Sequence, residues 1–253
     1  MGRYLGQHFL KNKSVIEHAV QAITPQPNGI LEVGPGAMAL TNLLIESFTP
    51  LILVERDPKL IQPIRDKIAP FTHVRLVHRD VLEYDFQSAY EQFQGPFGLI
   101  SNLPYLISTP FLERLLPISG LFTKVYLMLQ KEVVEKVLAP SGPKSTRLSH
   151  LLRLFYTVES GPIVPPNAFA PPPKVDSQFL QLTPIAPHIS VEELTLFKKF
   201  LQQGYNHRNR TLSWFIKKFL IESPPLSNQK LEDLSTFDWC KIFRYNLKPK
   251  VYS

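Results

Sequence analysis

The sequence predicts an α/β fold, in which helices cover a mostly parallel β-sheet, followed by a small all-helical domain. Three observations predict it. Within residues 1–160, short apolar runs alternate with longer stretches of mixed polarity, which is the pattern of βα units. Residues 162–173 contain six prolines, and beyond residue 187 apolar residues recur with helical spacing. The chain therefore divides into residues 1–186 and residues 187–253, at a boundary near Ala186.

Five apolar runs in the first region are separated by enough residues for a helix, as parallel strands require. These runs are Gly29–Val33, Leu51–Val54, Val74–Val77, Phe97–Ser101 and Lys124–Leu129. Thr41–Phe48 and Pro58–Ala69 are predicted helices between them. Residues that follow parallel strands meet at the carboxyl edge of the sheet, so that edge is where we expect a ligand.

Two further apolar runs, Leu151–Val158 and Gln178–Leu182, follow without an obvious long helix between them. This spacing predicts an antiparallel hairpin at the edge of the sheet. Residues 162–173 are predicted to form a stiff loop, because proline lacks the N–H group and fixes φ. In the last region, helices are predicted from apolar residues at helical spacing: Leu194, Phe197 and Leu201, then Leu212, Phe215, Ile216 and Phe219.

The composition is that of a soluble, folded protein. Of 253 residues, 44% are hydrophobic and 19% are charged, which excludes a disordered chain, a collagen-like rod and a coiled coil. No run approaches the ~18 apolar residues that cross a bilayer, and the start lacks an apolar secretion signal. We expect a cytoplasmic protein with no membrane partner. The single cysteine, Cys240, excludes an internal disulfide and a Cys-rich zinc site, and we expect no metal.

The net charge of +7 is unevenly distributed along the chain. From His188 to the end there are 11 Lys and Arg against 6 Asp and Glu, a net +5, which leaves +2 for residues 1–187. A basic segment beside a nearly neutral larger domain indicates a polyanionic partner, most simply a nucleic acid, although solubility alone also explains such a charge.

A glycine turn follows the first predicted strand. Gly34-Pro35-Gly36-Ala37-Met38-Ala39 has the G-x-G-x-x-A spacing of a nucleotide-binding turn, where glycines let the backbone approach a ligand. Glu55 follows the second strand, 19 residues after Gly36, where an acid accepts hydrogen bonds from ribose hydroxyls. The turn fits a dinucleotide or S-adenosylmethionine, because both present an adenosine. Asp80, after the third strand, would accept from an adenine amino group or cap the following turn.

The fourth predicted strand is followed by Asn102-Leu103-Pro104-Tyr105. The exocyclic amine of a nucleobase is a poor nucleophile because its lone pair is delocalised into the ring, and acceptors for its N–H groups favour the pyramidal, reactive form. The Asn102 side chain and the Leu103 carbonyl supply two such acceptors, while the Tyr105 ring offers a face for stacking. The same four residues also suit an ordinary turn. After a strand of a nucleotide-binding sheet, they predict a methyltransferase that acts on adenine.

Other segments carry a resemblance that extends over nearly the whole chain. They are Gly6-Gln7-His8-Phe9-Leu10, Glu32-Val33-Gly34-Pro35-Gly36, Leu129-Gln130-Lys131-Glu132-Val133, Arg147-Leu148-Ser149 and Phe169-Ala170-Pro171-Pro172-Pro173-Lys174-Val175-Asp176-Ser177. Together with Glu55, Asp80 and the tetrapeptide from Asn102, they are highly specific. The chain closely resembles the ribosomal RNA adenine N6,N6-dimethyltransferases of the KsgA type.

The resemblance implies a class I, Rossmann-like, seven-stranded methyltransferase domain over residues 1–186, a helical rRNA-binding domain over residues 187–253, and S-adenosylmethionine as methyl donor. The substrates would be two adjacent adenines near the 3′ end of small-subunit rRNA, in an immature ribosomal subunit. We expect a monomer. Asn102, Leu103 and Tyr105 would be catalytic, with Phe169 as a second aromatic that sandwiches the flipped base opposite Tyr105. By position, donor contacts would fall on His8, Leu10, Gly34, Gly36, Glu55, Asp80 and Asn102.

Two departures from the family pattern bear on binding. His8 stands where many members carry Asn, so that it would contact the donor through its side chain or only through its backbone. Residues 206–211 resemble a more basic family stretch with three successive cations, which Asn209 interrupts here. This interruption bears on the strength of the rRNA contact.

Three other functions compete with this interpretation. The macrolide-resistance methyltransferases, which modify an adenine of large-subunit rRNA, share the tetrapeptide chemistry, but their usual tetrapeptide has Ile before Pro where this chain has Leu103. A non-catalytic assembly or transcription factor would keep the fold without needing intact Glu55, Asp80, Asn102 and Tyr105. A nicotinamide-dependent oxidoreductase has no use for the tetrapeptide.

Overall fold

The computed structural model describes residues 8–24, 28–47, 50–219 and 228–247. It groups the chain into two compact units. The first unit comprises Met1–Val134 and Thr157–Pro184, and the second comprises Glu135–Tyr156 and Ile185–Ser253.

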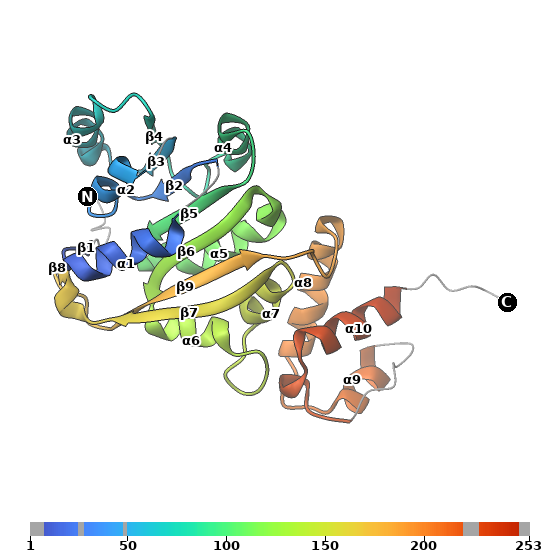
Figure 1. Ribbon diagram of the computed structural model, residues 1–253. Helices are drawn as coiled ribbons and strands as arrows, with labels where there is room; N and C mark the ends of the chain where they lie inside the picture. The colour runs from blue at the N-terminus through green and yellow to red at the C-terminus, as the bar shows by residue number, and fades with distance from the viewer. Residues whose placement is uncertain (1–7, 25–27, 48–49, 220–227, 248–253) are drawn as a thin grey trace. The chain divides into compact units, whose positions relative to one another are not determined.

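The first unit is built on a seven-stranded sheet with the order β4-β3-β2-β5-β6-β9-β7 (Figure 1). Parallel pairing joins β2 to β3 and β5, β3 to β4, and β5 to β6, whereas β9 runs antiparallel to β6. The predicted parallel sheet is confirmed, and the predicted run Gln178–Leu182 lies within β9, next to the edge strand β7. The strands are β2 Ile30–Val33, β3 Leu51–Glu55, β4 Val74–His78, β5 Phe97–Asn102, β6 Phe122–Gln130, β7 Tyr156–Val164 and β9 Ser177–Pro184.

Helices connect the parallel strands, and several begin at a side-chain cap that satisfies a free backbone N–H group. Asn12, Asp57 and Asp85 cap α1, α3 and α4, respectively. Helix α1 packs against β5 and β6, and α3 against β3 and β4. The helices are α1 Lys13–Ile23, α2 Thr41–Ser47, α3 Pro58–Ile68, α4 Phe86–Phe93, α5 Ser108–Leu115 and α6 Lys131–Leu138, with 3₁₀ turns η1 Tyr105–Ile107 and η2 Leu116–Leu121.

The proline-rich segment is more regular than a loop. Strand β7 runs through Pro162 to Val164, which is possible because β7 is an edge strand, where proline removes no ladder hydrogen bond. After the 3₁₀ turn η3, Pro166–Ala168, the short strand β8, Phe169–Ala170, pairs antiparallel with β1, Phe9–Leu10. Figure 1 shows β1 and β8 side by side next to α1. This pairing ties the start of the described chain to the proline-rich segment.

In the second unit, one predicted strand is corrected. Leu151–Val158 was expected to be extended, but α7, Arg147–Arg153, includes its first three residues, and β7 begins only at Tyr156. The reason is local, because Thr146 and Ser149 form a capping box that starts a helix. The contacts of α7 with α8 and α10 place Glu135–Tyr156 in the second unit, whereas the sequence had assigned it to residues 1–186.

The core of the second unit is largely aromatic. The helices α8 Val191–Tyr205, α9 Leu212–Phe219 and α10 Thr236–Leu247, with the 3₁₀ turn η4 Leu231–Asp233, supply it. Phe200 contacts Phe197, Phe215, Trp239 and Phe243 at ring-centroid distances of 5.6–6.2 Å. Among the described residues of both units, none of the helices is long and apolar enough to span a membrane.

Candidate active site

The candidate site lies at the carboxyl edge of the sheet in the first unit. The chain moves from β2 outward to β3 and β4, then crosses to β5 on the other side of β2. Such a reversal of strand order leaves a crevice beyond the strand ends. Gly34, Glu55, Asp80 and Asn102 lie at or just after the ends of β2, β3, β4 and β5, in that order, so the fold brings four predicted site residues to one edge.

The glycine turn after β2 has the conformation that its glycines allow. Gly34 and Gly36 have φ of 66° and 56°, in the left-handed region that side chains disfavour. A Cβ added to Gly34 would meet no atom within 4 Å, so open space adjoins the backbone there. The Gly34 N–H donates to the Val54 carbonyl (2.9 Å), which ties the turn to β3.

Glu55 is a fixed acceptor at the end of β3. Its side chain is buried, with 4% of its surface exposed. One carboxylate oxygen, Oε1, accepts from the N–H groups of Arg56 and Asp57, both at 2.8 Å, and Oε2 accepts from the N–H group of Gly36 at 3.2 Å. Because each oxygen has two lone pairs, Oε2 keeps one for a ligand. The main chain therefore fixes the carboxylate before any ligand arrives.

Glu32, in the middle of β2, is a site residue to which the sequence analysis gave no role. It lines the same cavity as Glu55 and is 2% exposed, with Thr41 Oγ1 donating to its Oε2 at 2.7 Å. Burial raises the pKa of Glu32 to about 8, and the nearby Glu55 charge acts in the same direction, whereas the hydrogen bond from Thr41 lowers the pKa. Its signal in the sequence was an acid inside the otherwise apolar run of β2.

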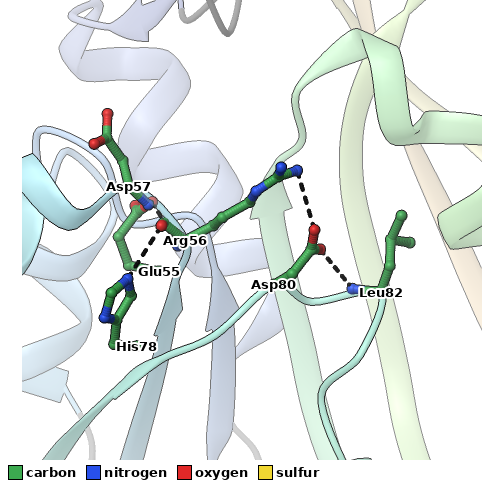
Figure 2. Close-up of polar contacts among 6 residues, drawn as sticks. All are labelled: Glu55, Arg56, Asp57, His78, Asp80 and Leu82. Carbon is green, nitrogen blue, oxygen red and sulfur yellow. Dashed lines mark hydrogen bonds and ion pairs between the residues drawn. The ribbon is translucent and has the colours of Figure 1, made fainter. Parts of the chain in front are cut away.

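Asp80, just after β4, is held by two partners, as Figure 2 shows. The Leu82 N–H group donates to its Oδ1 at 2.9 Å, which is the turn-capping bond that the sequence allowed. The Arg56 guanidinium lies 3.0 Å from its Oδ2. The turn bond and the ion pair together set the direction of this carboxylate.

Asn102, the last residue of β5, has its amide orientation set by one hydrogen bond. Its Nδ2 donates to the His8 carbonyl at 2.9 Å, which leaves Oδ1 as the group that faces away from that bond. The following N–H group, of Leu103, donates to the Met128 carbonyl at 3.3 Å. Both bonds come from segments distant in sequence, and they fix the strand end on which two acceptors were predicted.

Tyr105 lies in the turn η1 with its ring secured at two places. Its hydroxyl is 2.8 Å from Ser177 Oγ on β9, and its ring centroid is 5.8 Å from that of His8. Burial raises the pKa of the Tyr105 hydroxyl. His8 Nδ1 lies 2.8 Å from the Pro171 carbonyl, which only accepts, so Nδ1 carries a proton. The His8 side chain thus contacts the proline-rich segment.

These residues line two adjoining hollows, which we call the main cavity and the side slot. Both include Gly34, Glu55 and Pro104. The wall of the main cavity includes the predicted residues His8, Leu10, Gly34, Gly36, Glu55, Asn102, Leu103 and Tyr105. The wall of the side slot includes Val33, Val54, Arg56, Asp80, Val81, Leu106 and Ile107.

Phe169 is the predicted site residue that neither hollow includes. It is 1% exposed and belongs to a hydrophobic core cluster with Leu10, its partner across β1 and β8. The role of Phe169 as the second aromatic against the flipped base stays a prediction. Gly6 and Gln7 of the first family segment lie outside the described residues.

The comparisons with known proteins agree with this geometry. The family model for ribosomal RNA adenine dimethylase matches residues 2–246. The chain belongs to this family. Ribosomal RNA small subunit methyltransferase A of Xanthomonas campestris pv. campestris is 39% identical over 211 residues, which are 82% of this chain and 80% of that protein. The protein of that name from Variovorax paradoxus is 36% identical over 219 residues, or 86% and 84% of the two chains.

Two solved structures have the same fold. A dimethyladenosine transferase from Plasmodium falciparum has a TM-score of 0.74 and 21% identity, covering 94% of this chain and 97% of that one. The 23S rRNA methyltransferase ErmE has a TM-score of 0.70 and 19% identity, covering 94% and 99%. As a ribosomal RNA adenine dimethylase, the chain is an S-adenosylmethionine-dependent methyltransferase. The open space at Gly34 and the fixed Glu55 acceptor fit that donor.

Proposed function

We propose that this enzyme adds two methyl groups to N6 of each of two adjacent adenines near the 3′ end of small-subunit rRNA, acting as a cytoplasmic monomer on an immature subunit. Relatives named as small-subunit methyltransferases support the choice of subunit. The single observation that carries the chemistry is the Asn102 amide, held by the His8 carbonyl so that its oxygen is the acceptor at the end of β5.

The donor would bind across the main cavity and the side slot. S-adenosylmethionine supplies a methyl group on a sulfonium, and transfer leaves a thioether. Glu55 would accept from the ribose hydroxyls through Oε2, because its other oxygen is already bonded to two N–H groups. Asp80, on the wall of the side slot, would accept from the adenine amino group. The glycine turn would let the donor approach the backbone at Gly34.

The target adenine would be held by the tetrapeptide. The Asn102 oxygen and the Leu103 carbonyl would each accept one N–H of the adenine amine, which favours the pyramidal nitrogen that attacks the methyl carbon. As the N–C bond forms and the C–S bond breaks, the amine becomes cationic and then loses one proton to solvent. The ring of Tyr105, held by Ser177, would stack on the base.

A second transfer to the same nitrogen requires the base to turn, because the methylated amine keeps one N–H. Stacking on Tyr105 tolerates this turn better than directional hydrogen bonds would. The Tyr105 ring would supply one stacking face, and Phe169, which is 1% exposed, is proposed as the opposite face. Dimethyladenosine is the expected end product.

The second unit has a surface that suits single-stranded RNA. The Arg210 guanidinium and the Lys218 ammonium lie 5.4 and 5.0 Å from the Trp214 ring centroid, and the His207 ring lies 5.0 Å from it. We call these four residues the tryptophan patch. In sites for single-stranded RNA, cations bind the phosphates and a neighbouring aromatic ring stacks on a base. The patch supports an rRNA contact that does not depend on a cation at Asn209.

The test is nucleoside mass analysis of immature small subunits after incubation with the protein and labelled S-adenosylmethionine. We expect labelled dimethyladenosine in small-subunit rRNA, and on the order of a hundredfold slower labelling with the Asn102→Ala variant. Large subunits in a parallel reaction are the control for the macrolide-resistance activity. Label in large-subunit rRNA alone, or an end product of monomethyladenosine at saturating donor, would refute the proposal.

A further inference from the structure

Arg56 connects the two carboxylates that would bind the donor. Its N–H group donates to Glu55 Oε1 at 2.8 Å, and its guanidinium lies 3.0 Å from Asp80 Oδ2. Its carbonyl accepts from His78 Nε2 at 3.3 Å. Figure 2 shows Arg56 extending from the end of β3 toward Asp80, with His78 at its main chain. The main chain of Arg56 is thus fixed on both sides, and its side chain starts from a defined point.

The ion pair lies on the wall of the side slot. Arg56 and Asp80 both contribute to that wall, together with apolar residues such as Pro104 and Ile107. The Arg56 side chain is 59% exposed and the Asp80 side chain 23% exposed. Solvent screens a pair this exposed, so the pair adds little to the stability of the fold. Its position on the slot wall suggests a role in binding instead.

We propose that Arg56 is a positioning residue for the methyl donor. By holding Asp80 Oδ2 while Leu82 holds Oδ1, Arg56 orients the carboxylate before the adenine amino group arrives. Each oxygen has a second lone pair, so Asp80 accepts from the adenine without losing either partner. Preorganisation of this kind improves affinity because the ligand does not have to order the acceptor. The inference rests on the proposed donor site.

The experiment compares three variants by calorimetry with S-adenosylhomocysteine, and by steady-state kinetics on immature small subunits. Arg56→Leu should weaken affinity and raise the donor KM by roughly three- to tenfold, with kcat changed less than about twofold. Arg56→Lys should recover part of the loss. The matched control is Arg65→Leu, because Arg65 is an exposed arginine of α3 that lines neither hollow. An equal loss in that control would overturn the proposal.

A double-mutant cycle separates positioning from a general effect of charge. In an Asp80→Ala background, Arg56→Leu should have no further effect on affinity, because there is no carboxylate left to orient. Additive losses of affinity in the double variant would overturn the proposal. Tighter donor binding by the single variant Arg56→Leu would also overturn it, because that result means that Arg56 covers the slot. If the parent binds the donor and methylates the subunit, and Arg56→Leu has the same donor affinity as the parent, only the role of Arg56 is refuted. A parent that binds no donor would refute the proposed function as well.

Discussion

Glu32 and Glu55 are 2% and 4% exposed in the first unit, whereas Arg208 and Arg210 lie exposed in the second. A buried acid has to be neutralised by a proton or satisfied by fixed donors. Glu32 is neutralised by its raised pKa of about 8, and Glu55 is satisfied by three N–H groups. The exposed arginines need neither, because water solvates them. The two units therefore use polar groups in different ways.

This contrast has a consequence for binding. In the first unit, each polar group has one position, so a single substitution removes a contact that no neighbour replaces. In the second unit, the electrostatic free energy of binding to a polyanion depends on the sum of the charges, and neighbouring cations such as Lys218 also contribute to it. We expect large, residue-specific effects in the first unit and small, salt-dependent effects in the second.

The largest effect is expected from Asn102→Ala. Loss of the acceptor oxygen should lower kcat on the order of a hundredfold, which corresponds to about 3 kcal/mol of transition-state stabilisation. Donor affinity should fall less, because the amide matters most as the amine pyramidalises. The rate of methyl transfer is measured by single-turnover methylation of immature subunits. Asn42→Ala, on the exposed side of α2, is the matched control. Near-normal turnover by Asn102→Ala would contradict the assigned mechanism.

Glu55→Ala should have the next largest effect, on donor binding. Hydrogen bonds to a charged group are each worth roughly 1.5–3 kcal/mol, so donor affinity should fall about tenfold or more. Binding to immature subunits without donor should not change, because the buried Glu55 carboxylate would contact the donor and not the RNA. Calorimetry with S-adenosylhomocysteine decides this, with Glu46→Ala on the exposed surface of α2 as the control. An unchanged affinity would remove Glu55 from the site.

Much of the first unit could be predicted because its site is made of strand ends. Apolar runs locate parallel strands, and the glycines mark the positions of positive φ. Glu55 and Asn102 therefore lie where their spacing placed them. The prediction failed at Leu151–Val158, where the short capping box at Thr146 outweighed β-compatible residues. The burial of Phe169 was not predicted either, because pairing between β1 and β8 depends on contacts distant in sequence.

Other features of the molecule depend on contacts in the folded chain that the spacing of residues along the sequence does not indicate. The pair of Arg56 and Asp80 joins residues 24 positions apart, and each residue alone has an ordinary explanation at a surface turn. The proton on Glu32 follows from complete burial, which one acid in a strand does not indicate. The tryptophan patch forms when α9 brings Trp214 beside His207, so only the basic part of that surface was visible in the sequence.

Charge reversal in the second unit should have a smaller effect. Arg208→Glu combined with Arg210→Glu should weaken binding to immature subunits about tenfold at moderate salt and flatten its salt dependence, because fewer counterions are released. Donor affinity should not change. The matched control reverses Arg65 and Lys67, which are exposed in the last turn of α3. Equal salt slopes for the variant and the parent would show that the arginines of the second unit do not meet phosphate.

The smallest effect at neutral pH is expected from Glu32→Gln, and it depends on pH. Because the pKa of Glu32 is raised to about 8 by burial, its side chain is neutral at pH 7 and resembles an amide. The second unit contains a counterpart, because burial lowers the pKa of His150 to about 4, with a further contribution from Arg153. Both groups are neutral in the folded protein, but they affect stability in opposite directions.

Between pH 4.5 and 8 the folded chain keeps a proton on Glu32 that the unfolded chain has lost, so this group makes stability fall as pH rises through that window. His150 makes stability rise between pH 4 and 6.5, because there the unfolded chain holds the extra proton. From pH 6.5 to 8 only Glu32 contributes of the two. In urea unfolding, the free energy of unfolding of Glu32→Gln should therefore decline less steeply with pH than that of the parent in that range. His150→Gln should match the parent there.

The donor affinity of Glu32→Gln should stay within about threefold of the parent's at pH 7. Above pH 8 it should be weaker than the parent's, because the ionised carboxylate of the parent attracts the cationic donor. Parallel stability curves for Glu32→Gln and the parent would mean that Glu32 is ionised in the folded protein.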